Sequence, residues 1–401
     1  MRIVFIGPFA MQPKRTMAVR ALPLARALAA RGHQVLMLLP AWDHPEDAGW
    51  EWVEQGLRVH NVPLPAKLPV LFHLCLTWRL LSECLSFRPE VVHCFKPKSY
   101  SGLAAWALWQ MQRLGQFKAR LLVDADDWES SGGWNELERY SWLQKRFFVW
   151  QERWGLTHCD ALTVASRALE TIVWSLGVKP ERVHYLPNGW AGEQDAPDAG
   201  AQVELRRSLG LEEAPVALLY TRFFEFGLDR ALAIMRGVLA LAPEVRWLVV
   251  GKGLFGEEQL LLTAAQETGI AAHITYAGWV PAAQVPQYLA LARFAIYPFD
   301  DTLVNRCKCA VKLIDLLAAG VAVVADRVGQ NAEYILDGVS GLLVEPGDTP
   351  AFVAAAVRLL RDAELAGQLG RQARQRLRDQ FAWQHLVETA EGAYVERDRS
   401  E

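Results

Sequence analysis

The sequence predicts an α/β protein with two domains, each a doubly wound parallel sheet covered by helices. Its 401 residues suit two domains of common size. The chain opens with a strand at Arg2–Ile6, a helix at Ala18–Arg31 closed by glycine, and a strand at Val35–Leu39, which together form a βαβ unit. A later run, Val321–Ala325, is apolar at every position, as in a parallel strand covered on both faces.

Composition excludes several classes of protein. A net charge of −3 argues against a general nucleic-acid binder. No segment reaches about 18 uninterrupted apolar residues, so we expect no membrane-spanning helix. The start, MRIVFIGPF, is typical of a first strand rather than a signal peptide. The six cysteines form no CxxC pair, which indicates reduced thiols in a cytoplasmic protein and no zinc site.

Charge divides the chain unevenly. Residues 1–190 hold 22 Lys and Arg against 17 Asp and Glu, whereas the remainder holds 20 against 28. A basic, tryptophan-rich first half would suit a phosphorylated acceptor or peripheral contact with the inner face of a membrane. Chance asymmetry explains the same numbers equally well.

The remaining elements of the first domain follow from apolar runs and turn residues. We expect strands at Leu57–Val62, 91–93, Arg120–Val123, Ala161–Ala165 and Val183–Leu186. We expect helices at Lys67–Phe87, Ser101–Leu114 and Trp134–Thr157, and a further helix that is capped by Ser166 and ends at about Gly177. The aromatic stripe of the helix Trp134–Thr157 is expected to lie in the core; the alternative is a peripheral membrane face.

Polar side chains gather where two of these strands end. His93 closes one strand, and Asp124, Asp126 and Asp127 follow the next. Ligands bind at the carboxyl ends of such strands. Clustered carboxylates raise one another's pKa, so one of them could accept a proton. The alternative is that Asp126 or Asp127 caps a following helix.

The second domain follows a linker at Gln194–Ala201. We expect strands at Pro215–Tyr220, Arg246–Val250, Ile274–Ala277, Phe294–Tyr297, Val321–Ala325 and Gly341–Val344, and helices at Leu228–Leu241, Val285–Leu291, Ala310–Ala318, Pro350–Arg361, Ala363–Gln380 and His385–Arg397.

The helix at Ala310–Ala318 carries an expected anion site. Lys308 and Lys312 lie near its N-terminus, where backbone N–H groups carry about half a positive charge, so phosphate is a natural ligand. Asp315, one turn further along, suits hydrogen bonds from the hydroxyls of a ribose. The alternative is an ordinary surface helix decorated with lysines.

The segment KLIDLLAAGVAVVADRVGQNAEYI resembles the donor-nucleotide segment of retaining glycosyltransferases of family 4 (group 1), which have the GT-B fold. Asp315 stands where that family has the second glutamate of its E-x7-E motif, and Cys307 replaces the first. The tripeptide Pro187-Asn188-Gly189 also recurs in the family before the interdomain linker.

The resemblance implies two Rossmann-like domains facing a cleft: residues 1–193 bind the acceptor, 203–380 bind the nucleotide sugar, and a helix at 381–397 crosses back. It assigns Arg222, with Lys308 and Lys312, to the donor diphosphate; Phe226 occupies a position that is lysine in the family. Gly251 and Val280, with Asp315, would border the nucleotide. The loop carrying Lys14 and Arg15 would face the acceptor.

The function so implied is retaining transfer of a sugar from a nucleotide-diphospho-sugar to an acceptor hydroxyl, as in the synthesis of cell-envelope polysaccharide. Asp124, Asp126, Asp127 and His93 are the candidate catalytic residues. We expect no cofactor, because the nucleotide sugar is a co-substrate, and no metal, although D-x-D binds cations in the other large glycosyltransferase fold. The acceptor stays open: a glycan, a lipid-linked sugar or a small molecule.

Three rival functions remain. A GT-B sugar epimerase would share the fold and the nucleotide site. The missing first glutamate and Phe226 favour a catalytically degenerate binding protein. A nicotinamide-dependent dehydrogenase is disfavoured because GPFAMQPKR lacks the G-x-G-x-x-G fingerprint.

Overall fold

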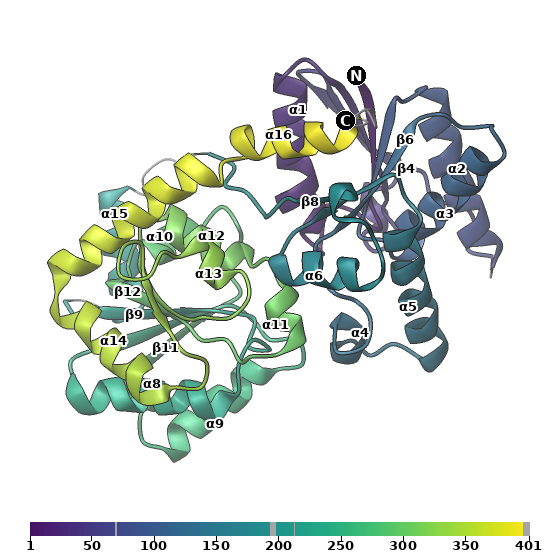
Figure 1. The fold of residues 1–401 in the computed structure, drawn as a ribbon. Helices are drawn as coiled ribbons and strands as arrows, with labels where there is room; N and C mark the ends of the chain where they lie inside the picture. The colour runs from purple at the N-terminus through teal and green to yellow at the C-terminus, as the bar shows by residue number, and fades with distance from the viewer. Residues whose placement is uncertain (69, 193–197, 212, 396–401) are drawn as a thin grey trace. The chain divides into compact units, whose positions relative to one another are not determined.

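The computed structural model describes residues 1–68, 70–192, 198–211 and 213–395, which form two compact units (Figure 1). The first unit comprises Met1–Ala191, the short segment Cys307–Cys309 and the chain from Phe381 onward. The second comprises Gly192–Arg306 and Ala310–Gln380. Each unit is a mainly parallel sheet covered by helices, so the predicted pair of Rossmann-like α/β domains is confirmed.

The first unit has a sheet of order β3-β4-β2-β1-β5-β6-β7-β8 among the described residues. Only the edge pair β3 and β4 is antiparallel there. The strands are β1 (Arg2–Ile6), β2 (Gln34–Pro40), β3 (Glu51–Glu54), β4 (Leu57–Val62), β5 (Val91–Phe95), β6 (Arg120–Ala125), β7 (Ala161–Val164) and β8 (Val183–Tyr185).

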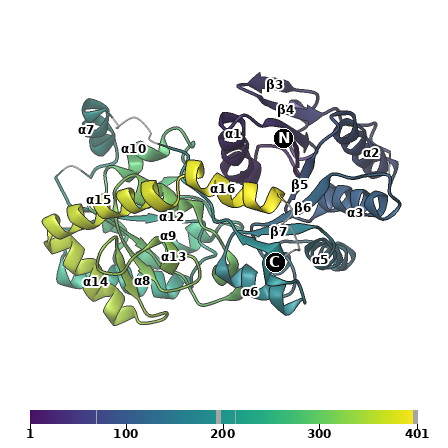
Figure 2. The ribbon, with the colours of Figure 1, turned by 45° about the horizontal axis from the view of Figure 1, so that its top comes forward.

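Alternate side chains of β1 enter two separate hydrophobic clusters, because successive residues of a strand point to opposite faces. Val4 and Ile6 belong to one cluster, and Ile3 and Phe5 to the other. The second cluster also takes in Leu386 of the last helix, α16 (Trp383–Tyr394). Figure 2 shows α16 beside α1, on the face of the sheet opposite α2 and α3.

One expected helix of this unit is divided by a loop. The expected single helix Trp134–Thr157 is broken into α4 (Trp134–Leu137) and α5 (Trp142–Thr157), because Ser141 caps α5 in a reciprocal pair with Gln144. The remaining helices are a π-helical turn at Met17–Ala21, α1 (Leu22–Ala30), α2 (Leu71–Ser86), α3 (Ser99–Arg113) and α6 (Arg167–Ser175), with 3₁₀ turns at Pro45–Asp47 and Pro180–Arg182. Ser166 caps α6 as predicted, accepting from the amide of Leu169.

The expected burial of the aromatic stripe on α5 is wrong. Trp142 is 66% exposed and Leu143 71% exposed. Two buried residues of α5 are instead polar: Gln151 bonds to the backbone of Ser99 at the start of α3, and Glu152 to the loop at Glu129. Helical periodicity identified the helix, but its inward face combines these polar contacts with apolar packing by Leu156.

The second unit has a fully parallel sheet of order β11-β10-β9-β12-β13-β14 in the described residues. Its strands are β9 (Val216–Tyr220), β10 (Arg246–Val250), β11 (Ile274–Gly278), β12 (Phe294–Tyr297), β13 (Ala322–Asp326) and β14 (Leu342–Val344). Its helices are α7 (Ala199–Ser208), α8 (Leu228–Leu241), α9 (Glu257–Glu267), α10 (Val285–Leu289), α11 (Leu303–Cys307), α12 (Val311–Ala318), α13 (Asn331–Tyr334), α14 (Thr349–Arg361) and α15 (Ala363–Gln380), with a 3₁₀ turn at Ala271–His273.

The ends of two expected segments lie outside the described residues. Residues 194–197 belong to the expected linker, and the structure has α7 beginning already at Ala199. The expected end of the last helix, at residues 396–397, also lies outside. No helix in the described ranges is long and apolar enough to span a membrane.

Candidate functional site

Residues predicted for the donor nucleotide lie at one edge of the second sheet. Arg222 follows β9, Gly251 follows β10 and Val280 follows β11, and these three strands are neighbours and parallel. Their carboxyl ends therefore meet at the same edge, where ligands of doubly wound sheets bind. Val280 is buried, whereas its neighbour Trp279 is 66% exposed.

Gly251 brings these loops close together. Its φ is +130°, and a Cβ built at this position would lie 1.9 Å from the carbonyl oxygen of Thr221. The Gly251 amide donates to the carbonyl of Gly278 at 2.8 Å. The Gly251 carbonyl accepts from the Tyr276 hydroxyl at 3.0 Å. Only glycine fits this conformation and this close approach.

Tyr220 connects the two side chains expected on α12. The Lys312 ammonium lies 3.5 Å from the centroid of the Tyr220 ring. The Tyr220 hydroxyl donates to Asp315 Oδ2 at 3.4 Å. A cation and a carboxylate are thus held at the carboxyl end of β9, two residues before Arg222. Sequence reasoning missed Tyr220, although its place as the last residue of β9 was available.

The turn after β9 directs Arg222 outward. Glu225 accepts from Thr221 Oγ1 at 3.0 Å and from the backbone amide of Arg222 at 3.2 Å. Phe226, at the position that is lysine in the resembling family, packs in the core of the second unit. The Arg222 side chain is exposed, so it is available to a ligand.

Lys308 belongs to a different unit from Lys312. It lies in the segment Cys307–Cys309, which groups with the first unit. Cys307 is buried in a core cluster of that unit. Cys309 accepts two hydrogen bonds from Asn188: from its amide to Sγ at 3.1 Å, and from its Nδ2 to the carbonyl oxygen at 2.8 Å.

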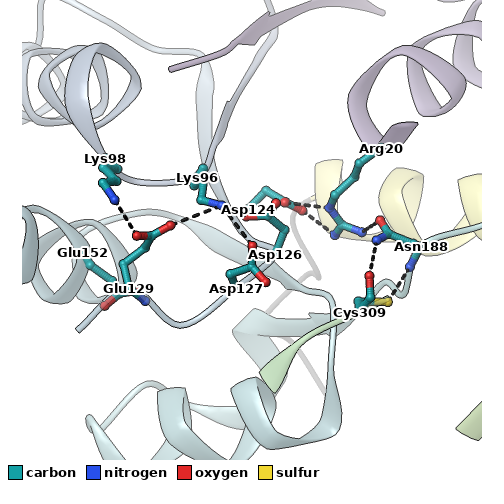
Figure 3. A network of polar contacts seen from close by, with 10 residues as sticks. All are labelled: Arg20, Lys96, Lys98, Asp124, Asp126, Asp127, Glu129, Glu152, Asn188 and Cys309. Atoms are coloured by element: carbon teal, nitrogen blue, oxygen red, sulfur yellow. Dashed lines mark hydrogen bonds and ion pairs between the residues drawn. The ribbon is translucent and has the colours of Figure 1, made fainter. Parts of the chain in front are cut away.

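The first unit carries a cluster of opposite charges after β5 and β6 (Figure 3). The Lys96 ammonium lies 3.0 Å from Asp127 Oδ2, 3.1 Å from Glu129 Oε1 and 3.5 Å from Asp126 Oδ1. Lys98 Nζ lies 2.5 Å from Glu129 Oε2. The expectation that Asp126 or Asp127 caps a helix is wrong, because α4 begins after Gly133 without a side-chain cap.

This cluster separates the proton affinities of its carboxylates. Burial raises the pKa of Asp127, against the opposing effect of Lys96. Burial alone would raise the pKa of Glu129 too, but Lys96 and Lys98 together lower it. Two carboxylates whose environments push their pKa values apart are suited to different roles in proton transfer.

Glu152, on α5, forms hydrogen bonds with the loop that carries Glu129. Its carboxylate accepts from the amide of Glu129 at 2.8 Å and from the Ser130 hydroxyl. Burial raises the pKa of Glu152 to about 8, so it is largely protonated at neutral pH. A neutral acid here holds the loop without adding a negative charge.

Asp124 is not part of this cluster. It is fully buried and forms a two-pronged ion pair with Arg20, at 2.8 Å and 2.6 Å. Thr163 also donates to it at 2.6 Å. Arg20 in turn donates to Asn188 Oδ1 at 3.1 Å, which links Asp124 to the segment containing Cys309 (Figure 3).

The expected orientation of His93 is corrected by the structure. The ring is fully buried in the middle of β5 rather than exposed at its end. Its nitrogens lie 3.0 Å from the Tyr394 hydroxyl and 3.0 Å from Thr163 Oγ1. Burial, with the charge of Arg20, lowers the pKa of His93 to about 3. A neutral core histidine of this kind has no exposed atom for a substrate.

The loop with Lys14 and Arg15 follows β1 in the same unit. Lys14 Nζ lies 5.6 Å from the centroid of the Phe9 ring. Partial burial lowers the pKa of Lys14, and repulsion from Lys98 and Lys96 acts in the same direction. Lys14 is therefore close enough to the charged cluster to interact with it electrostatically. Within the described residues, no group of three or more His, Cys, Asp or Glu side chains is arranged to hold a metal ion.

Two family models match the chain. A model described as a glycosyl transferase 4-like domain matches residues 15–189, and a model described as glycosyl transferases group 1 matches residues 214–362. Together they account for most of both units. The chain therefore belongs to the group 1 glycosyltransferases with a family 4-like first domain, as the resemblance indicated.

Individual relatives agree with this assignment. The chain is 24% identical over 364 residues to a GDP-mannose-dependent alpha-(1-6)-phosphatidylinositol monomannoside mannosyltransferase of Mycolicibacterium smegmatis, with 88% of each chain covered. Among solved structures, sucrose-phosphate synthase from Thermosynechococcus elongatus gives a TM-score of 0.71 at 21% identity over 98% of both chains. HepE of Anabaena, in complex with UDP and glucose, gives 0.69 at 17% identity over 98% of both chains. These likenesses show the GT-B fold.

Proposed function

We propose that the protein is a retaining glycosyltransferase that moves a sugar from a nucleotide-diphospho-sugar to an acceptor hydroxyl. The observation that carries the proposal is the arrangement around Tyr220, which holds Lys312 and Asp315 at the carboxyl edge of the second sheet. A cation and a carboxylate side by side suit a diphosphate and the ribose hydroxyls next to it.

In this proposal, the second unit stabilises the leaving group. Lys312 and Arg222 bind the diphosphate and neutralise the charge that develops as the sugar–oxygen bond breaks. Lys308, which lies in the segment that groups with the first unit, stays a predicted ligand of the diphosphate. Asp315 accepts hydrogen bonds from ribose hydroxyls, and Gly251 lets the backbone approach the nucleotide beside Val280.

The first unit orients the acceptor in this proposal. The cluster of Asp126, Asp127 and Glu129 lies at the carboxyl ends of its strands and can accept hydrogen bonds from hydroxyl groups. Asp127 is the best candidate to receive the acceptor proton, because its pKa is raised by burial. Lys14 and Arg15 lie on the neighbouring loop. The reaction needs no metal in this proposal, so excess EDTA should leave turnover unchanged.

The first test is a thermal-shift panel of UDP, GDP and ADP with the intact chain. A ligand at about a hundred times its dissociation constant stabilises the folded state by about 2.7 kcal/mol, which raises Tm measurably. Uracil and guanine nucleotides are both needed, because the named relatives bind UDP and use GDP-mannose respectively. Stabilisation by one diphosphate supports the donor site; no shift with any of them contradicts it.

A degenerate binding protein is the second candidate, because Phe226 and Cys307 both lie in cores where the family would place polar side chains. Binding protein and enzyme differ in turnover. With the diphosphate identified, the matching nucleotide sugars are incubated with the protein and a set of glycosides. Release of nucleotide that depends on the glycoside identifies a transferase, release without any glycoside indicates an epimerase or hydrolase, and no release leaves a binding protein.

Peripheral membrane contact is also part of the proposal. The outer face of α5 exposes Trp142, Leu143 and Trp150, and the Arg146 guanidinium lies 5.0 Å from the Trp142 ring. Apolar and basic side chains on one helix face favour an anionic membrane surface. Flotation with anionic but not neutral vesicles, reduced in Trp142→Ala, is expected. Flotation that is equal with both vesicle types, or absent with both, contradicts it.

A further inference from the structure

A hollow of the first unit is lined by residues other than those of the charged cluster. Its cavity, of about 320 Å³, is lined by residues of the loop after β1, of the loop after β2 and of the β3–β4 hairpin. The lining residues are Met11, Gln12, His44, Asp47, Trp50, Trp52 and Asn61. Small-molecule sites in proteins usually measure about 300–1,000 Å³, so this cavity suits a ligand at the small end of that range.

Two tryptophans form one wall of the cavity. Trp50 is 67% exposed, although it carries one of the largest apolar surfaces of any side chain. Its ring centroid lies 6.2 Å from that of Trp52, with 59° between the ring planes. Trp52 packs partly against the core, which fixes its position. Two angled indole faces of this kind leave room for a ring-shaped ligand to pack against one of them.

Asn61 supplies a polar group without a partner inside the protein. Its backbone is fully used, since its amide donates to the carbonyl of Trp50 at 2.9 Å and its carbonyl accepts from Gly49 at 2.8 Å. The residue is only 2% exposed, yet its side-chain Oδ1 has no hydrogen-bond partner. A buried, unpaired amide oxygen costs about 1–3 kcal/mol unless a ligand or water donates to it.

We propose that this cavity binds an uncharged pyranose ring of the acceptor, and the inference rests on the proposed transferase function. The C–H face of the ring packs on Trp50 or Trp52, because the faces of aromatic rings carry negative charge and attract polarised C–H groups. Ring hydroxyls exchange hydrogen bonds with Asp47 and Gln12, whereas Asn61 Oδ1 is closed to the cavity in this conformation. The acceptor is then a glycoside rather than a simple alcohol.

The charges of the lining select against anionic ligands. No lysine or arginine occurs among the lining residues that the structure describes. The imidazole of His44 already faces a carboxylate, since its Nδ1 lies 3.2 Å from Asp47 Oδ2. Glu46, which is strongly exposed, adds a negative charge next to the opening. A phosphate, a uronic acid or an anionic lipid headgroup would meet carboxylates without a cation.

The position of the cavity fits an acceptor site. Its walls come from the carboxyl ends of β1, β2 and β4, the same sheet edge that carries the Lys96 cluster after β5. Gln12 lines the cavity, and Lys14, two residues further along, feels the charges of Lys96 and Lys98. The loop after β1 therefore separates a sugar site from the charged cluster proposed to act on the acceptor hydroxyl.

The test is saturation-transfer NMR on the intact chain with methyl glycosides. The probes are the methyl α-pyranosides of glucose, galactose, mannose and N-acetylglucosamine, with methyl glucuronoside as the anionic probe and uridine as a flat aromatic probe. Signals from the ring C–H protons of at least one neutral glycoside are expected, and none from the glucuronoside. Trp50→Ala should weaken binding by about fivefold to tenfold, the contribution of one aromatic contact.

Trp78→Ala is the matched control, because Trp78 is 68% exposed on α2 and does not line the cavity. Equal transfer in Trp50→Ala and Trp78→Ala overturns the inference, as does binding of the glucuronoside or of uridine alone at this site. Titration of the same variants with the nucleoside diphosphate separates the two proposals. Diphosphate binding without a Trp50-dependent sugar signal refutes only this inference; a Trp50-dependent sugar signal without diphosphate binding refutes only the proposed donor chemistry.

Discussion

The guanidinium of Arg20 and the carboxylate of Asp124 form a two-pronged ion pair in the interior of the first unit. Nε donates to Oδ1 at 2.8 Å and Nη2 donates to Oδ2 at 2.6 Å, with both side chains almost completely buried. The pair joins the π-helical turn before α1 to the end of β6, and Arg20 also donates to Asn188. A carboxylate that is paired and buried in this way stabilises the edge of the sheet and has no exposed atom for a substrate.

Arg20→Met should therefore destabilise the first unit strongly. Removing one partner of a buried pair leaves the other charge uncompensated and typically costs about 3–5 kcal/mol. Arg26→Met is the control, because Arg26 pairs with Glu54 on the surface, where such pairs contribute about 0–1 kcal/mol. Urea unfolding of both variants checks this. Equal midpoints would contradict the prediction, and Arg20→Met combined with Asp124→Leu should recover part of the loss.

The sequence predicted the strands of both sheets well where apolar runs are unbroken. The expected bounds are correct for β10 (Arg246–Val250) and β12 (Phe294–Tyr297). A strand that is buried on both faces is a continuous apolar run, so its ends are easy to locate in the sequence. The edge strand Glu51–Glu54 was not identified as a separate element. It has two apolar residues, Trp52 and Val53, between two glutamates at the border of the sheet, and only Trp52 is partly buried, whereas Val53 is exposed.

The candidate site was less predictable, since side-chain partners distant in sequence decide it. Asp124 looked available after a strand, but its partner Arg20 lies 104 residues earlier. The sequence pattern of α5 predicted where the helix lies in the chain, but it did not predict which side of the helix is buried. That side is decided by the loop to which Glu152 is hydrogen-bonded. Trp50 carried no local motif, and only the folded hairpin places it beside Asn61.

Lys312→Ala should weaken binding of the nucleoside diphosphate. A hydrogen bond from a charged group contributes about 1.5–3 kcal/mol, so the loss corresponds to roughly tenfold to 150-fold in affinity. Isothermal titration with the diphosphate identified by thermal shift measures the change. Lys179→Ala is the control, since Lys179 is an exposed lysine of the first unit. If both variants bind like the unmodified protein, Lys312 does not hold the diphosphate.

Gly251→Ala should disrupt the loops that border the nucleotide. The added Cβ would overlap the Thr221 carbonyl at 1.9 Å, and the backbone at φ +130° disfavours any L side chain. Gly256→Ala offers a matched comparison, because Gly256 also has a positive φ, of +94°, but a Cβ added there would meet no atom within 4 Å. Strain alone costs about 1–3 kcal/mol at Gly256.

The two glycine variants are compared by urea unfolding and by titration with the diphosphate. Gly251→Ala should lose more stability than Gly256→Ala and should also lose affinity for the diphosphate, whereas Gly256→Ala should keep it. Equal affinity in the two variants would show that the close approach of Gly251 to Thr221 is unnecessary for the donor site.

His93 makes the stability of the first unit depend on pH in a defined window. Its folded pKa of about 3 lies well below the value of about 6.5 in an unfolded chain. Between these values the unfolded state binds more protons than the folded state. The stabilisation is therefore complete above about pH 6.5 and decreases as the pH falls towards 3, by at most about 1.4 kcal/mol per pH unit.

His93→Gln isolates this contribution, because glutamine does not titrate and the other groups change equally in both proteins. The variant is expected to be less stable at neutral pH, since it cannot keep both hydrogen bonds, to Tyr394 and Thr163. Its urea midpoint should fall less steeply than that of the unmodified protein between about pH 6.5 and 5. Parallel decreases in the two proteins would mean that the imidazole accepts a proton in the folded state, and would make His93 a catalytic candidate again.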